Sequence, residues 1–217
     1  MIKTTQSTYD VGGLIAAAGL YSDEVAGMLY GPALPFRILP FRGEYYSLSE
    51  QAASKVKGLV YPVPNPAFPF LGVHFTRHID GSVAVGPNAV LAMGKESYHW
   101  GRWHAREIGQ ILAYQGFWRL VKRYGKEGLK ELQRALFKSL YLRNLRTYAP
   151  FLCAKDLIKG KAGVRAQACD KNGYLLDDFL ILRQKKAVFI GNAPSPAATA
   201  CLAIGQYVAN MWQEVGR

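Results

Sequence analysis

The chain has 217 residues, of which 50% are hydrophobic, 12% aromatic and only 19% charged, and its net charge is +12 at pH 7. This composition excludes a disordered chain and is sufficient for the hydrophobic core of one or two domains. Three widely spaced cysteines, Cys153, Cys169 and Cys201, argue against a disulfide framework and favour a reducing compartment.

The first apolar segment, residues 14–18, ends at Gly19 and is expected to form a buried strand followed by a tight turn. Ser22 or Asp23 is placed to cap the short helix that follows. Residues 11–20 are rich in Gly and Ala, which is not typical of a signal peptide, and no apolar run of the chain is long enough to span a bilayer. We therefore expect a cytoplasmic protein.

Residues 36–86 have the composition of an antiparallel sheet. Gly, Pro and Asn clusters separate segments that are rich in β-branched and aromatic residues. These segments are residues 44–48, 58–63, 70–77 and 82–86. Residues 79–82, with the sequence IDGS, are expected to form a hairpin turn between the last two.

Residues 104–148 change to helical spacing. Four leucines recur on one face, Leu129, Leu132, Leu136 and Leu140. Charged residues fill the outer face, Lys130, Glu131, Arg134 and Lys138. Gly125 and Gly128 are expected to separate this helix from an earlier one at about residues 108–123.

This helical region is also the most basic part of the chain. Residues 100–149 contain eleven Lys and Arg against three Glu, which leaves a charge of +8. Such a charge is usually the solvent-exposed face of a helix, and peripheral contact with the inner membrane surface is the alternative. No nucleic-acid-binding motif accompanies the charge, so we expect no nucleic-acid partner.

The last third returns to strands, at residues 163–169, 174–182 and 187–190, and closes with a helix of small residues at about 197–212. Together these elements predict an α+β fold with a large antiparallel sheet and helices.

Four strings occur in an order and spacing that resemble the FAD-dependent L-2-hydroxyglutarate oxidases and dehydrogenases. They are LPFRGEYY at residues 39–46, the run at 61–92, AGVRAQA at 162–168 and NAPSPAAT at 192–199. That family belongs to the flavoproteins that resemble D-amino acid oxidase. The resemblance implies an FAD cofactor and oxidation of L-2-hydroxyglutarate, or a similar small 2-hydroxy acid, to the 2-oxo acid.

The same resemblance implies three segments. Residues 1–30 would be a fragment of the FAD-binding α/β domain, 31–185 the substrate-binding domain, and 186–217 the closing strand and helix of the FAD-binding domain. The chain contains no G-x-G-x-x-G motif, so we expect the family's opening β-α-β unit to be absent from it. A separate N-terminal FAD-binding half is the candidate partner that would supply it. Whether this truncated chain is an enzyme stays open, and a non-catalytic basic module that binds a membrane or a partner is the alternative.

Two segments are cofactor candidates by this resemblance. The first is Ala18, Gly19 and Leu20, where Gly19 would let the backbone approach FAD, or would be an ordinary turn glycine. The second joins a strand to a helix, where backbone N–H groups and hydroxyls would face the flavin, or would form a plain helix entry. It comprises Ala193, Pro194, Ser195, Pro196, Ala197, Ala198 and Thr199.

His74 is the candidate base for the substrate hydroxyl, with a structural histidine as the alternative. Strand alternation places Thr76 on the face of His74 and Arg77 on the other, so Thr76 is the substrate-binding candidate of the two.

Arg165 follows small residues in a predicted strand, where an unpaired arginine inside a sheet would be costly. The resemblance implies that it holds a substrate carboxylate, with a salt bridge to Asp177 or Asp178 as the alternative. Tyr45 is a candidate for a hydrogen bond to the substrate, and Glu44 is expected to pair with Arg42. The histidines have no spacing typical of a metal site, and we expect none.

Overall fold

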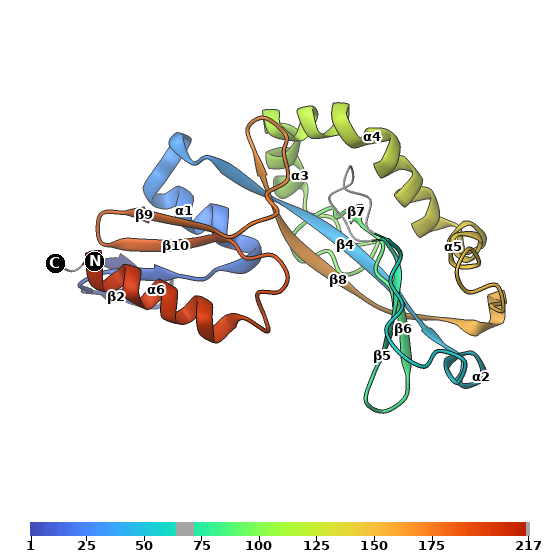
Figure 1. Cartoon of the computed structure of the whole chain (residues 1–217). Helices are drawn as coiled ribbons and strands as arrows, with labels where there is room; N and C mark the ends of the chain where they lie inside the picture. The colour runs from blue at the N-terminus through green and yellow to red at the C-terminus, as the bar shows by residue number, and fades with distance from the viewer. Residues whose placement is uncertain (64–71, 216–217) are drawn as a thin grey trace. The chain divides into compact units, whose positions relative to one another are not determined.

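The computed structural model describes residues 1–63 and 72–215 (Figure 1). Within them, helices and three sheets are present, two of which contain antiparallel strands next to helical segments. The expected α+β class is therefore confirmed.

The chain divides into two compact units. The terminal unit consists of Met1–Ile38 together with the chain from Ala166 onward, and the central unit is Leu39–Arg165. The chain passes between units within two long strands, β4 (Phe36–Leu48) and β8 (Leu157–Asp170). The sequence analysis placed its segment boundaries at residues 30 and 185, and the functional assignment of those segments stays a prediction.

The terminal unit contains a three-stranded sheet in the order β3-β10-β9. Strand β10 (Ala187–Asn192) runs parallel to β3 (Leu14–Ala16) and antiparallel to β9 (Leu180–Gln184). Helices α1 (Ser22–Tyr30) and α6 (Cys201–Val215) both contact β10. Nearly all residues of β10 are buried, as a central strand between two helices requires.

The two helices cover opposite faces of this sheet. Phe189 of β10 packs with Ala26 of α1 in a buried cluster. Val188 pairs with Ile15 of β3, and cross-strand partners share a face. Because side chains alternate along a strand, Ile15 and Ile190 point to the face opposite α1, where α6 lies.

Helix α1 forms as expected, but its cap differs from the prediction. Its N-cap residue is Tyr21, with no side-chain cap. Ser22 instead donates from its hydroxyl to the carbonyl of Gly191 at 2.9 Å, and the Asp23 carboxylate accepts from the N–H of Ile38 at 3.1 Å. Both side chains are buried, so they serve backbone groups of distant strands rather than the ends of their own helix.

Short elements complete the terminal unit. A two-stranded ladder pairs β1 (Ile2–Lys3) with β2 (Thr8–Tyr9), and 3-10 turns η1 (Gly19–Tyr21) and η2 (Gly31–Ala33) flank α1. Helix α6 begins at Cys201 and not near Ala197, because residues 197–200 form hydrogen-bonded turns first. Of the expected strand at 174–182, only β9 forms, together with a single bridge between Cys169 and Leu175.

The central unit has a sheet in the order β5-β6-β4-β7, with β8 pairing to β4. Strands β5 (His74–Arg77) and β6 (Val83–Gly86) form the predicted hairpin, and β7 (Val90–Leu91) pairs antiparallel with β4. Gly81 of the turn has φ +84°, a conformation that glycine adopts without strain. The strand expected at residues 58–63 is wrong, because only Val60 bridges Phe75. The short helix α2 (Glu50–Ala53) was not expected.

The helical region differs most from the prediction. It contains α3 (Ala105–Leu112), α4 (Gln115–Leu136) and α5 (Lys138–Leu145), followed by the 3-10 turn η3 (Ala154–Asp156). Helix α4 runs through Gly125 and Gly128, since a glycine costs a helix only about 1 kcal/mol and does not end it.

The predicted inner face of this helix is wrong too. Leu129, Leu132 and Leu136 are exposed, whereas Glu131 is buried and pairs with Arg134 at 2.6 Å. In the described part of the chain, no helix is both long and apolar enough to cross a membrane.

Candidate functional site

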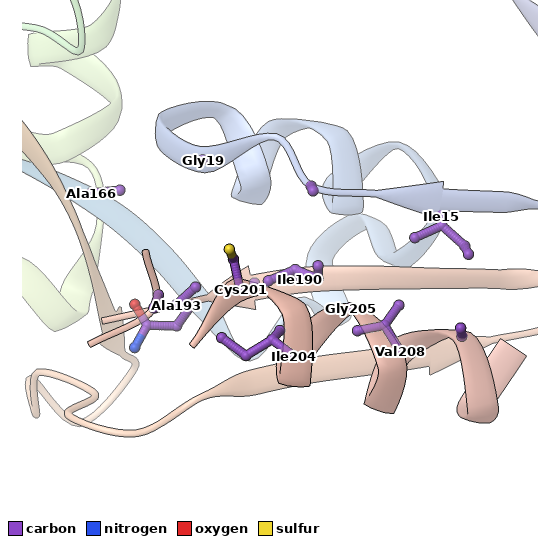
Figure 2. A pocket seen from close by; sticks show the side chains of 14 residues that line it. Ile15, Gly19, Ala166, Ile190, Ala193, Cys201, Ile204, Gly205 and Val208 are labelled. Carbon is purple, nitrogen blue, oxygen red and sulfur yellow. The ribbon is translucent and has the colours of Figure 1, made fainter. Parts of the chain in front are cut away.

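A cavity of about 490 Å³ lies in the terminal unit, between the face of the sheet that carries Ile15 and Ile190 and helix α6 (Figure 2). Its volume is within the range of small-molecule and cofactor pockets. Its lining is almost wholly apolar. The lining residues are Ile15, Ala17, Gly19, Ala166, Ile190, Gly191, Asn192, Ala193, Ala197, Cys201, Ile204, Gly205, Val208 and Ala209.

Small side chains create this space. Ala197, Cys201, Gly205 and Ala209 recur every four residues, which places them on one side of α6 and the turn before it. Larger side chains at these positions would fill the cavity. Figure 2 shows Cys201, Gly205 and Val208 along α6, with Ile190 and Ile15 on the facing strands.

Part of each predicted cofactor segment lines this cavity. Gly19 of the first segment and Ala193 and Ala197 of the second do so, although they are more than 170 residues apart in the chain. Gly19 has φ +53°, which favours glycine at the turn after β3. The remaining predicted cofactor residues do not line it: Ala18, Leu20, Pro194, Ser195, Pro196, Ala198 and Thr199.

The hydrogen bonds of the second segment differ from expectation. The N–H of Ala197 donates to Pro194 at 2.9 Å and that of Thr199 to Pro196 at 3.1 Å. The Thr199 hydroxyl also donates to Pro196, at 3.0 Å. These donors are occupied within the segment itself in this structure, and a ligand contact of Thr199 stays a prediction.

Asn192 is the polar residue of the lining, and the sequence analysis did not select it. Its side-chain amide donates to the carbonyl of Leu176 at 3.0 Å and to that of Asp178 at 2.8 Å. The residue is buried at the end of β10. It therefore ties the loop before β9 to the strand that enters the cavity wall.

The four-residue spacing of Ala197, Cys201, Gly205 and Ala209 was visible in the sequence and could have identified the rest of the α6 wall. No comparable signal marks Ile15, Ala17 or Ala166, because an apolar strand residue has the same pattern whether it faces a core or a cavity.

The central unit brings three substrate candidates to one face of its sheet. Tyr46, Val85 and Phe75 are successive cross-strand partners, and this face packs in the core. His74 and Thr76 therefore point to the opposite face, as strand alternation predicted, and so does Tyr45, the neighbour of Tyr46.

The ring of His74 is held in a defined orientation. It stacks on Tyr61 with centroids 4.5 Å apart, and its Nδ1 lies 3.1 Å from the carbonyl oxygen of Gly72. A carbonyl only accepts hydrogen bonds, so Nδ1 is the donor, and in the neutral ring Nε2 is then the acceptor. Among the described residues Nε2 has no hydrogen-bond partner, so this nitrogen can accept a proton.

The arginines have different surroundings from those expected. Arg165 is exposed on β8 and makes no ion pair within the described residues, so the expectation of an arginine inside a sheet is wrong. Arg77 donates to the carbonyls of Ala53 and Val56, at 3.3 and 2.9 Å, and thereby binds the chain at the end of α2.

Comparisons with known proteins point in one direction. The family model described as FAD dependent oxidoreductase matches residues 2–211. L-2-hydroxyglutarate dehydrogenase of Indibacter alkaliphilus is 47% identical over 205 residues, which cover 94% of this chain and 51% of that protein. The Escherichia coli K12 protein of the same name is 44% identical over 214 residues, 98% of this chain and 50% of its own length. The mitochondrial one of Mus musculus is 40% identical over 206 residues, 93% and 44% of the two chains.

This chain thus spans about half the length of the curated relatives that it matches. Among solved structures, the reduced, FAD-bound L-alpha-glycerophosphate oxidase of Mycoplasma pneumoniae is similar in fold, with a TM-score of 0.58. It is 19% identical, and the match covers 97% of this chain and 45% of that one.

Proposed function

The chain belongs to the family of FAD dependent oxidoreductases, and from that premise we propose that it is part of an enzyme that oxidises L-2-hydroxyglutarate, or a similar 2-hydroxy acid, to the 2-oxo acid. The relatives with 40–47% identity, which are named for that substrate, support this choice. The observation that carries the proposal is the cavity in the terminal unit, because parts of both predicted cofactor segments line it.

The cavity suits a flat aromatic ring system. Gly19, Ala193 and Ala197 present little or no side chain, so a ring can lie against the backbone there. When bound, FAD supplies the acceptor for the hydride that leaves the carbinol carbon.

The central unit would bind the substrate and accept its hydroxyl proton. Nε2 of His74 would accept the proton of the substrate hydroxyl, since Nδ1 is already held by Gly72. Tyr45 and Thr76, on the same face, would donate hydrogen bonds to the substrate. Arg165 would bind a carboxylate through two parallel N–H contacts, for which an exposed guanidinium is available.

A separate N-terminal half would complete the cofactor site. The chain has no G-x-G-x-x-G motif to hold the pyrophosphate of FAD. Within the described residues, β3 pairs on one side only, with β10, so its other edge is open to a further strand. A β-α-β unit with the motif could add there.

A second candidate is a non-catalytic basic module that contacts a membrane or a partner. The charge of +8 in residues 100–149 favours it. Peripheral membrane contact is also compatible with the enzyme, so it is part of the first proposal as well.

Flavin reduction tests the proposal. The purified chain is mixed with FAD, alone and with a separately expressed half carrying G-x-G-x-x-G, and bound flavin is measured by its absorbance at about 450 nm. We expect the band to bleach in the absence of oxygen when L-2-hydroxyglutarate is added, and to persist with the D enantiomer. A folded chain that binds no flavin with either preparation would contradict the enzymatic proposal.

A further inference from the structure

Helix α4 presents three different faces. Its inner face packs on the central unit through Phe117, Leu120 and Glu131, which are buried. The other two faces are exposed, and one of them is apolar. An amphipathic helix of a globular protein normally buries its apolar face, so this arrangement needs a reason.

The exposed apolar face is a continuous stripe. Its members are three, four or, across Gly125, eight residues apart, so they lie on one side of the helix. They are Trp118, Val121, Leu129, Leu132 and Leu136, with exposed fractions of 54%, 40%, 56%, 36% and 57%. The indole N–H of Trp118 donates to the carbonyl of Leu112 at 2.8 Å, so the exposed part of this ring is its apolar body. We call this set the apolar stripe.

A row of lysines runs beside the apolar stripe. Lys122, Lys126 and Lys130 are four residues apart and exposed. At 100° per residue they lie next to the stripe and away from the inner face. We call them the lysine row.

The two surfaces together identify the kind of partner. A helix with modest overall hydrophobicity, a lysine-rich face and Trp and Leu on the adjoining face is typical of helices that lie in the plane of a membrane interface. A second copy of the chain is disfavoured, because self-association through the stripe would bring two lysine rows together on chains of charge +12.

We propose that α4 is the element through which this protein docks on an anionic lipid bilayer. The apolar stripe enters the boundary between headgroups and acyl chains, and the lysine row contacts the headgroups. The inference rests on the membrane contact proposed above but not on the flavin chemistry. It goes further in naming the surface and its orientation.

Vesicle binding by the purified chain tests the assignment. Vesicles of phosphatidylcholine, with and without phosphatidylglycerol, are sedimented with the protein. We expect binding to the anionic vesicles only, weakened at high salt. Lys122→Gln, Lys126→Gln and Lys130→Gln together should lower the partition coefficient about 100-fold, since each such lysine contributes about a factor of five. The pair Leu132→Gln and Leu136→Gln should lower it about tenfold or more.

Two controls place changes of the same kind outside α4. Lys57→Gln, Lys159→Gln and Lys161→Gln remove the same charge from exposed sites outside α4, and Ile79→Gln changes an exposed apolar residue in the hairpin turn. Circular dichroism verifies that every variant keeps its helix content. The controls should bind nearly as the unmodified chain does.

The outcomes distinguish whether the protein binds membranes at all from whether α4 is the element that binds. If the unmodified chain ignores anionic vesicles, membrane contact itself is wrong. If it binds but the α4 variants bind like their controls, the assignment to α4 is overturned. If the stripe variants instead convert a dimer to a monomer in sedimentation and leave vesicle binding unchanged, the occupant is a second copy. Flavin reduction is measured without vesicles and fails or succeeds independently.

Discussion

The guanidinium Nη2 of Arg42 lies 2.5 Å from Oε1 of Glu44, and both side chains are buried. The same Oε1 accepts from the indole N–H of Trp100 at 2.5 Å, and the guanidinium stacks over that indole ring at 4.8 Å. The backbone N–H of Glu44 donates to Asn88 at 2.7 Å. The predicted pairing is confirmed, and it neutralises a buried carboxylate.

Removing one partner of the Arg42–Glu44 pair should lower the stability of the fold. We expect Glu44→Ala to lower the free energy of unfolding by about 3–5 kcal/mol, because a buried guanidinium is left without its counter-charge. Replacing both, as Arg42→Met with Glu44→Met, should cost clearly less. Urea denaturation measures both. Additive losses in the double variant would contradict a coupled pair.

Asp156 should make stability depend on acid pH. The N–H of Cys153 and the hydroxyl of Ser49 donate to its carboxylate, at 2.7 and 2.9 Å, and these bonds lower its pKa. A lowered pKa in the folded state adds stability above the unfolded-state pKa of about 3.9, and that stability is lost as pH falls through the folded-state value.

The variant Asp156→Asn should therefore unfold more easily at pH 7, by about 1–2 kcal/mol, because an amide presents a donor where two donors meet. The difference in free energy of unfolding between this variant and the unmodified chain should become smaller at acid pH. Asp177→Asn, at an exposed position, is the control and should stay within about 0.5 kcal/mol. A deficit that does not change between pH 7 and pH 3 would show that the charge has no part in it.

Tyr148 should make the free energy of unfolding depend on pH in the alkaline range. Its hydroxyl donates to the carbonyl of Val73, and burial raises its pKa to about 12. A raised pKa stabilises the folded state fully below the unfolded value of about 10, and this contribution is lost between about pH 10 and 12. Tyr148→Phe should flatten the fall in stability over that range, whereas the exposed Tyr207→Phe should leave it unchanged. Unfolding by urea at a series of pH values measures this.

The cavity can be filled without disturbing the rest of α6. Ala209 lines it, whereas Ala203 on the same helix does not. We expect Ala209→Leu to abolish or strongly weaken FAD binding, and Ala203→Leu to leave it unchanged, since both replacements suit a helix equally well. Fluorescence titration of FAD, in the presence of the complementary half, gives both affinities. Equal affinities would place the cofactor elsewhere.

His74 can be tested against a neighbouring histidine. We expect His74→Gln to slow reduction of the flavin by L-2-hydroxyglutarate about 10²–10⁴-fold, the usual contribution of a general base, and to flatten the pH dependence of that rate. His78→Gln, four residues further along the chain, should change neither. Stopped-flow absorbance measures the reduction step. A His74→Gln variant with unchanged rate and pH profile would remove the base from the mechanism.

The sequence by itself determined the elements whose pattern is local. Apolar alternation and the turn IDGS specified the β5–β6 hairpin, and the spacing of His74, Phe75 and Thr76 assigned each to its face. Adjacent charges at i and i+2 on one strand predicted the Arg42–Glu44 pair. The ordered strings identified the family, which the family model confirms. Each of these depends on neighbours in the chain.

Only the tertiary structure decided which face of a helix or strand is buried and which residues pack against it. Ser22 has the composition of a helix cap, yet its hydroxyl binds Gly191, a partner 169 residues away. Leucines of α4 repeat as a buried face would, yet they are exposed. The cavity lies between β3, β10 and α6, so the sequence of any one of these segments does not predict it. Periodicity states which residues share a face, whereas burial depends on distant segments whose approach is set by long-range packing.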